Sequence, residues 1–172
     1  MTAPGTGPVV VLVGPMGAGK STVAELLATA YGVTARDTDA DVEAAAGRTI
    51  SDIFVDSGEA HFRDLERAAV AEALASHDGV LALGGGAVLD PATREVLVGH
   101  RVVFLRVGLS EAVKRVGLGT ARPLLLGNVR SRIKALLDER TPVYESVADL
   151  VVDTDKRSPE DVADEIRKAL DA

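Results

Sequence analysis

Eight residues near the N-terminus carry the clearest chemistry in the sequence, Gly14-Pro15-Met16-Gly17-Ala18-Gly19-Lys20-Ser21. They match the pattern of a phosphate-binding loop, whose glycines let the backbone curl so that successive N–H groups point at a phosphate. Lys20 can reach between the β- and γ-phosphates of a nucleotide, and the Ser21 hydroxyl can bind Mg²⁺. The alternative is a glycine-rich turn without a ligand. The loop follows the apolar run Pro8–Val13 and opens a helix, which favours a nucleotide site.

Two carboxylates one residue apart, Asp37 and Asp39, form the second candidate group. They end a predicted strand over Val33–Thr38, and ligands of open α/β sheets gather at the carboxyl ends of strands. Alternate residues of an extended segment face the same side, so both acids can reach one ligand. Asp37 is the candidate for supporting the metal. The alternative is that the pair caps the helix predicted over Ala40–Ala46.

Short Val- and Leu-rich strands alternate with helical patterns along the chain, which predicts an α/β fold with a parallel sheet and helices on both faces. The predicted strands are Pro8–Val13, Val33–Thr38, Gly79–Leu83, Arg101–Val107 and Leu150–Val152. The predicted helices are Ser21–Tyr31, Ala40–Ala46, Ser51–Ser57 with Ser51 as its N-cap, Gly58–Ser76, Pro91–Val98, Ser110–Val116, Val129–Ser146 and one opening at Ser158-Pro159.

The composition narrows the class of protein. A length of 172 residues suits one compact domain, and a net charge of −7 opposes nonspecific binding to nucleic acid or to an anionic membrane. The absence of cysteine excludes disulfides and thiolate metal sites. The N-terminus lacks the basic flank and apolar core of a signal peptide, so we expect a cytoplasmic protein.

Taken together, the motifs resemble those of shikimate kinase. They are Gly14–Thr22, Asp37-Thr38-Asp39, Phe62-Arg63, Gly84-Gly85-Gly86, Arg122-Pro123-Leu124 and Arg140-x-x-x-Tyr144. The resemblance implies a three-layer P-loop fold like that of the nucleoside-monophosphate kinases, with a five-stranded parallel sheet. It implies one domain over residues 1–172, substrate-binding helices over about 39–66 and a mobile lid over about 117–128. It also implies a monomer that uses ATP and Mg²⁺ to phosphorylate the 3-hydroxyl of shikimate.

The resemblance also assigns roles around the acceptor. It implies that Asp39 binds the substrate hydroxyls and accepts a proton, and that Asp37 supports Mg²⁺ through water. From local sequence alone, Arg63 is a solvated charge on a helix. The resemblance instead makes Arg63 and Arg140 clamps for the substrate carboxylate, with Glu66 orienting one of them. The remaining expected substrate contacts are Phe54, Phe62, Gly84, Gly85 and Gly86.

On the nucleotide side, the expected contacts are Gly17, Ala18, Gly19, Lys20, Ser21, Thr22, Arg115, Arg122, Arg157 and Pro159. Arg122 is expected to act on the γ-phosphate from the lid. The alternative for the lid segment is an ordinary flexible loop. Surface charge and a plain helix cap are the alternatives for Arg115 and for the Arg157-Ser158-Pro159 segment. The triple glycine either forms a tight turn or brings a backbone N–H, that of Gly85, close to the substrate.

Two other functions remain open at the level of sequence. A different small-molecule P-loop kinase, such as one acting on gluconate, would share the phosphate loop and the fold. A nucleotide-binding regulator without catalysis would share the loop alone, and it would need neither the paired acids nor Arg122.

Overall fold

A five-stranded, fully parallel sheet forms the centre of the computed structural model, which describes residues 7–117 and 126–171. The strands are β1 (Val10–Val13), β2 (Ala35–Asp37), β3 (Val80–Ala82), β4 (Val102–Arg106) and β5 (Leu150–Asp153). Their spatial order is β2-β3-β1-β4-β5, so the chain reverses direction across the sheet around β1. The predicted sheet is confirmed. The loops after β1 and β3 lie beside each other at the carboxyl edge, where such a reversal opens a crevice.

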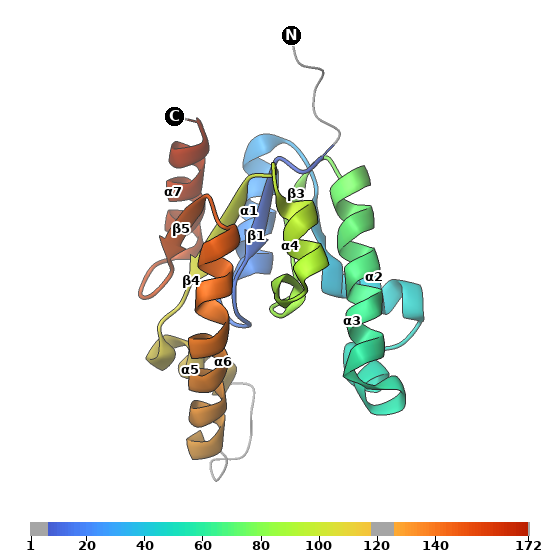
Figure 1. The fold of residues 1–172 in the computed structure, drawn as a ribbon. Coiled ribbons are helices and arrows are strands. Elements are labelled where there is room, and N and C mark those ends of the chain that lie inside the picture. Colours follow the sequence, from blue (N-terminus) through green and yellow to red (C-terminus); the bar gives the residue numbers. More distant parts are fainter. Residues whose placement is uncertain (1–6, 118–125, 172) are drawn as a thin grey trace.

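Helices cover both faces of the sheet, as predicted. They are α1 (Lys20–Tyr31), α2 (Thr38–Ala46), α3 (Ile50–Ser76), α4 (Pro91–Leu97), α5 (Leu109–Gly117), α6 (Leu126–Val147) and α7 (Pro159–Asp171), with a short 3₁₀ turn over Ala87–Leu89. Side chains of α1, α5 and α7 pack on one face, and those of α3, α4 and the C-terminal part of α6 pack on the other. In Figure 1, α2 and the first half of α3 extend beyond the sheet on one side, and α5 and the first half of α6 extend on the other.

The division between two predicted helices falls at a kink within α3. The helices predicted over Ser51–Ser57 and Gly58–Ser76 correspond to the two halves of α3, which Gly58 separates with the non-helical values of 84° for φ and 168° for ψ. The predicted N-cap at Ser51 is wrong, because the hydroxyl of Thr49 accepts a bond of 3.1 Å from Asp52 N–H and the helix begins at Ile50. The positive φ explains why the kink falls on a glycine.

Other element boundaries also differ from the sequence prediction. Thr38 belongs to α2 rather than to the preceding strand, because the Asp37 carboxylate caps the helix at that point. Gly117 ends α5 and Leu126 begins α6, so the first and last residues of the predicted loop over 117–128 are helical. Within the residues that the structure describes, no helix is both long enough and apolar enough to cross a membrane.

Candidate active site

The phosphate loop lies between β1 and α1 in a conformation that its glycines make possible. Gly14, Gly17 and Gly19 have φ values of 150°, 83° and 90°, which L side chains rarely adopt. A Cβ on Gly14 would lie 2.6 Å from the Leu105 carbonyl oxygen. No side chain caps α1, whose N-cap is Gly19, so the first N–H groups of the helix remain open to an anion.

Lys20 folds back over its own loop. Its Nζ donates to the carbonyl oxygens of Gly14 and Pro15, at 2.6 and 3.0 Å. Burial lowers the pKa of this amine to about 8, although the charges of Asp39 and Asp37 raise it. The loop therefore holds a cation at a cost in desolvation, and the anionic phosphates of a nucleotide would relieve that cost.

Asp37 serves two neighbours at once, through different oxygens. Its Oδ1 accepts from the backbone N–H of Asp39 at 2.8 Å and so caps α2. Its Oδ2 lies 3.2 Å from the Ser21 hydroxyl. Asp37 can therefore cap α2 and support a metal ion at the same time. Of the two aspartates, Asp37 alone caps the helix.

The oxygens of Ser21 and Asp37 are of the kind that Mg²⁺ prefers, and their separation fits one shared ion. Among residues 7–117 and 126–171, no group of three or more His, Cys, Asp or Glu side chains could hold a metal ion. A Mg²⁺ ion here would therefore complete its coordination with phosphate oxygens and water, as is usual for this ion at nucleotide sites.

Asp39 is half-buried beside the phosphate loop. Burial is the main cause that raises its pKa to about 6, and the negative charges of Asp37 and Glu66 add to the shift while Lys20 opposes it. A carboxyl group with this pKa is ionised at neutral pH and accepts a proton more readily than an ordinary aspartate.

The triple glycine after β3 makes room for charged side chains from two other elements. A Cβ on Gly84 would lie 2.5 Å from Asp39 Oδ1, and one on Gly86 would lie 2.5 Å from Arg63 Nη1. A Cβ on Gly85 would meet nothing closer than 3.6 Å. The Gly84 N–H donates to the buried Thr38 hydroxyl at 3.1 Å, which joins the triple glycine to the Asp37–Asp39 segment.

Arg63 and Arg140 reach the same region from opposite sides. Arg63, on α3, donates to Glu66 Oε1 at 2.8 Å and lies 3.5 Å from Glu59 Oε1. Arg140, on α6, has its Nη1 3.7 Å from where a Gly85 Cβ would be. Its buried Nε has no hydrogen-bond partner among the described residues. The Arg63 guanidinium carbon lies 5.3 Å from the centroid of the Phe62 ring, and the Phe54 ring packs against Phe62 with the centroids 4.8 Å apart.

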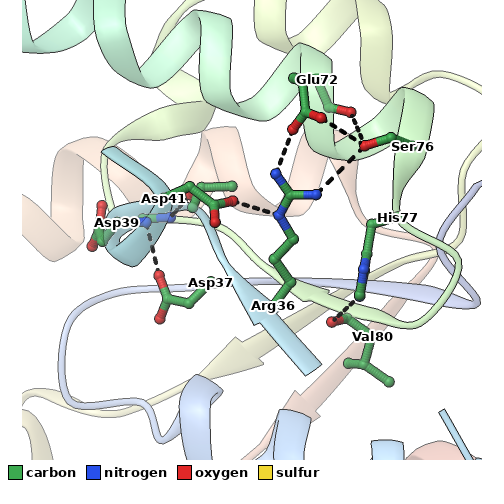
Figure 2. A network of polar contacts seen from close by, with 10 residues as sticks. Arg36, Asp37, Asp39, Asp41, Glu72, Ser76, His77 and Val80 are labelled. Atoms are coloured by element: carbon green, nitrogen blue, oxygen red, sulfur yellow. Dashed lines mark hydrogen bonds and ion pairs between the residues drawn. The ribbon is translucent and has the colours of Figure 1, made fainter. Parts of the chain in front are cut away.

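A charged network around Arg36 supports the segment that carries Asp37 and Asp39. No motif in the sequence indicates this role for Arg36, so the sequence prediction missed it. Arg36 lies in β2 directly before Asp37. Its Nε donates to Asp41 at 2.7 Å, and its Nη2 and Nη1 reach Glu72 and Ser76 of α3. Figure 2 shows the guanidinium between these partners, with Asp37 and Asp39 on the adjoining turn. Arg36 thus joins β2, α2 and α3.

The phosphate loop, the two aspartates Asp37 and Asp39, and the arginines Arg63 and Arg140 line one cavity of about 770 Å³. The predicted residues on its wall are Gly17, Gly19, Lys20, Ser21, Thr22, Asp37, Asp39, Phe54, Phe62, Arg63, Gly85, Gly86 and Arg140. Gly84 and Ala18 are not on this wall, because Gly84 lies behind Asp39 and Ala18 is buried. Glu66, expected to orient an arginine, also lines the cavity, and several apolar side chains, among them Ile133 and Leu137 of α6, are lining residues that the sequence prediction did not include.

A smaller cavity of about 290 Å³ adjoins the first along the phosphate loop, sharing Gly17, Gly19 and Thr22 with it. Its wall includes Ala18, Arg115, Arg157 and Pro159, so the structure brings together the residues expected near an adenine. Arg115 donates to the Gly17 carbonyl at 2.9 Å and to Thr154, which ties the loop to the segment after β5. Arg122 lies outside the described residues.

The fold and the cavity define a P-loop phosphotransferase: a nucleotide-phosphate loop opens into a pocket that holds a carboxylate and two arginines. The sequence matches the shikimate kinase family over residues 16–171. The chain therefore belongs to the shikimate kinase family, which confirms the resemblance seen in its motifs.

Individual relatives agree with this assignment. The chain is 59% identical over 165 residues to the shikimate kinase of Thermobifida fusca, covering 96% of each protein. It is 61% identical to that of Salinispora arenicola, covering 96% of this chain and 99% of the relative. It is similar in structure to the Acinetobacter baumannii shikimate kinase in complex with shikimate, with a TM-score of 0.85 and 35% identity over 96% of this chain and 93% of that one. A Sinorhizobium meliloti gluconokinase, at 23% identity and a TM-score of 0.59, shares the fold.

Proposed function

We propose that this protein transfers the γ-phosphoryl group of ATP to the 3-hydroxyl of shikimate, giving shikimate 3-phosphate for chorismate and aromatic amino-acid biosynthesis. The observation that carries the proposal is the joint placement of Lys20, Asp39 and two arginines around one cavity. A loop for phosphates and a pocket for a hydroxy acid then share a wall, as direct transfer between two bound substrates requires.

On the nucleotide side, the loop N–H groups and Lys20 bind the β- and γ-phosphates, while Ser21 and Asp37 hold Mg²⁺. The metal, when bound, neutralises charge on the phosphate oxygens during transfer. The smaller cavity takes the adenine between α7 and Arg115. Because phosphoryl transfer needs little covalent chemistry from the protein, most of the catalysis comes from positioning and from electrostatic stabilisation.

On the acceptor side, Arg63 and Arg140 bind the carboxylate of the acid, and Asp39 binds the hydroxyl that attacks. Neither the Gly85 nor the Gly86 N–H has a hydrogen-bond acceptor among the described residues, and both glycines line the cavity. These two N–H groups are available to substrate oxygens. Phe54 and Phe62 provide the apolar wall of the pocket, with Phe62 buried and Phe54 at 37% exposure.

Besides the roles of the individual site residues, three further expectations remain predictions. The lid over about 117–128 with Arg122 lies mostly outside the described residues, and Arg122 is proposed to act on the γ-phosphate. The chain is proposed to act as a single-domain monomer whose helices over about 39–66 bind the acid. We also propose that it functions in the cytoplasm.

The activity is tested by incubating the purified protein with MgATP and either shikimate, gluconate or no acceptor. We expect ADP and shikimate 3-phosphate to form in equal amounts, with ³¹P and ¹H NMR placing the phosphate on the 3-hydroxyl. Turnover of gluconate without turnover of shikimate would contradict the proposal and favour a gluconate kinase. Tight ATP binding without turnover of either acid would favour a regulator.

A pH dependence follows from the environment of Asp39. The ionised carboxylate is the form that accepts a proton, and its pKa is raised to about 6. We expect kcat/KM for the acid to fall as the pH drops through about 6, by about tenfold per pH unit well below the pKa. Above that pH the profile should be flat until other groups titrate.

The matched variant for this test is Asp37→Asn. Asparagine keeps the helix cap but removes one of the negative charges that raise the Asp39 pKa, so the acid limb should move to lower pH. A wild-type profile with no limb between pH 5 and 7, measured at saturating MgATP, would rule out Asp39 as the ionising group.

A further inference from the structure

Tyr144 has no part in the function described so far, yet it lies directly beneath the acid pocket. It is one helical turn after Arg140 on α6, so both side chains leave the same face of the helix. Its side chain is 1% exposed, and its ring packs against Phe104 of β4 with the centroids 5.0 Å apart. Its hydroxyl donates to the Gly85 carbonyl oxygen at 2.5 Å. The aromatic ring belongs to the core, while the hydroxyl belongs to the site.

The hydrogen bond acts on a segment that cannot hold its own conformation. Three consecutive glycines have wide backbone freedom, so the direction of each peptide must be set by outside contacts. Thr38 fixes one end through the Gly84 N–H. Backbone bonds from Ala87 and Leu89 hold the carbonyls of Gly84 and Gly86. Within the described residues, the Gly85 carbonyl is held by Tyr144.

Fixing this carbonyl also fixes an N–H group. A trans peptide is planar, and its carbonyl oxygen and amide hydrogen point in opposite directions. The Gly85 oxygen points toward Tyr144, so the Gly86 N–H of the same peptide points away from it. Gly86 lines the cavity, and its N–H has no acceptor among residues 7–117 and 126–171. A rotation of the Gly85–Gly86 peptide would remove this donor from the pocket.

The same hydroxyl neighbours the arginine of the pocket. The Arg140 guanidinium lies close enough to lower the pKa of Tyr144, against the burial that raises it. Arg140 Nη1 also lies near Gly85. Arg140 and the Gly85–Gly86 peptide are therefore both neighbours of one buried hydroxyl, although Arg140 lies on α6 and the peptide follows β3.

We propose that the Tyr144 hydroxyl is a positioning group for the acid substrate, which sets the Gly85–Gly86 peptide and Arg140 in the orientation that binds it. This inference rests on the proposed function, because it assigns the pocket to an acid acceptor. Tyr144 itself touches no substrate atom. Its hydroxyl acts through the two groups beside it, and its ring serves packing alone.

Tyr144→Phe separates the hydroxyl from the ring, since the phenylalanine ring retains the contact with Phe104. We expect the KM for shikimate to rise about 5–30-fold, as for the loss of one buried hydrogen bond that supports binding. The KM for ATP should stay within about twofold of wild type. The control is Tyr31→Phe, because Tyr31 is the other tyrosine, and its hydroxyl has no hydrogen-bond partner among the described residues. Tyr31→Phe should leave both KM values unchanged.

A second measurement needs no turnover. In assigned ¹⁵N spectra, Tyr144→Phe should shift the amide signals of Gly85 and Gly86 and speed their hydrogen exchange, whereas Tyr31→Phe should not. An unchanged shikimate KM, or unchanged glycine signals, would overturn the positioning role while leaving shikimate phosphorylation intact. Failure of the wild-type protein to phosphorylate shikimate would instead overturn the proposed function, and the glycine signals would still decide whether Tyr144 orients this segment.

Discussion

Lys20→Met is expected to lower kcat by about 10²–10³-fold, the cost of losing one well-placed donor to transition-state charge. Methionine keeps the length and the apolar stem of lysine but removes the cation that the loop holds over the Gly14 and Pro15 carbonyls. Binding of ADP should weaken less than kcat falls, because the loop N–H groups still bind the β-phosphate. Steady-state kinetics and calorimetric titration with ADP measure the two effects.

The same substitution should stabilise the free protein. The Lys20 pKa is lowered to about 8 from 10.5, so the folded state disfavours the protonated amine throughout the neutral range. The sign follows from linkage: folding gains stability as the pH rises from about 8 toward 10.5, and it is weakest below 8. Removing the charge should therefore raise Tm at pH 7, with a gain of about 1–3 kcal/mol.

The matched control is Lys134→Met, because Lys134 is exposed on α6 and paired with Asp138. It should change neither kcat nor Tm appreciably, as expected for a surface ion pair. A fall in kcat without a gain in Tm would mean that the loop does not hold Lys20 at a cost. A kcat within about threefold of wild type would remove Lys20 from the catalytic machinery.

Local sequence patterns predicted those parts of the molecule whose causes are local. The phosphate loop is one continuous segment, and its glycines are needed by its own backbone. The strands follow from short apolar runs, and the kink at Gly58 follows from a single glycine in a helical pattern. In each of these cases, the residues that cause the structure are the residues that adopt it.

The rest depends on contacts between distant segments. A side chain on Gly84 or Gly86 would displace the Asp39 carboxylate or the Arg63 guanidinium, although neither glycine has an unusual φ. Arg36 has partners in two helices, and Tyr144 has its partner 59 residues away. No pattern within one segment reveals such partners. The resemblance to a known family placed these residues in motifs without giving the physical reason for each.

The two arginines of the pocket should differ in what they contribute, although both bind the acid. We expect Arg140→Met to raise the KM for shikimate by about 10–100-fold, in line with a charge-assisted hydrogen bond. Arg63→Met should have a smaller effect on binding, because Glu66 and Glu59 already share its charge. The control is Arg132→Met, an exposed arginine on the same helix as Arg140, which should leave the KM unchanged.

The effects of the two substitutions on thermal stability should rank in the opposite order, with Arg63→Met the more destabilising. Arg63→Met leaves Glu66, which is 3% exposed, without its main cation, and breaking a buried pair costs about 3 kcal/mol. Arg140→Met instead removes a guanidinium whose buried Nε has no partner among the described residues, so Tm should hold or rise. Thermal melts of both variants at several pH values measure this contrast.

The pH dependence of these melts identifies why Arg63→Met lowers the stability of the fold. Burial already raises the pKa of Glu66, while Arg63 lowers it, so Arg63→Met raises that pKa further. A carboxyl group with a raised folded-state pKa loses folding stability as the pH rises through that pKa. The deficit of Arg63→Met should therefore be larger at pH 8 than at pH 5, and adding Glu66→Gln should restore Tm without restoring acid binding. A deficit that is the same at both pH values would mean that Arg63 stabilises the fold through its packing on Phe62, not through its charge.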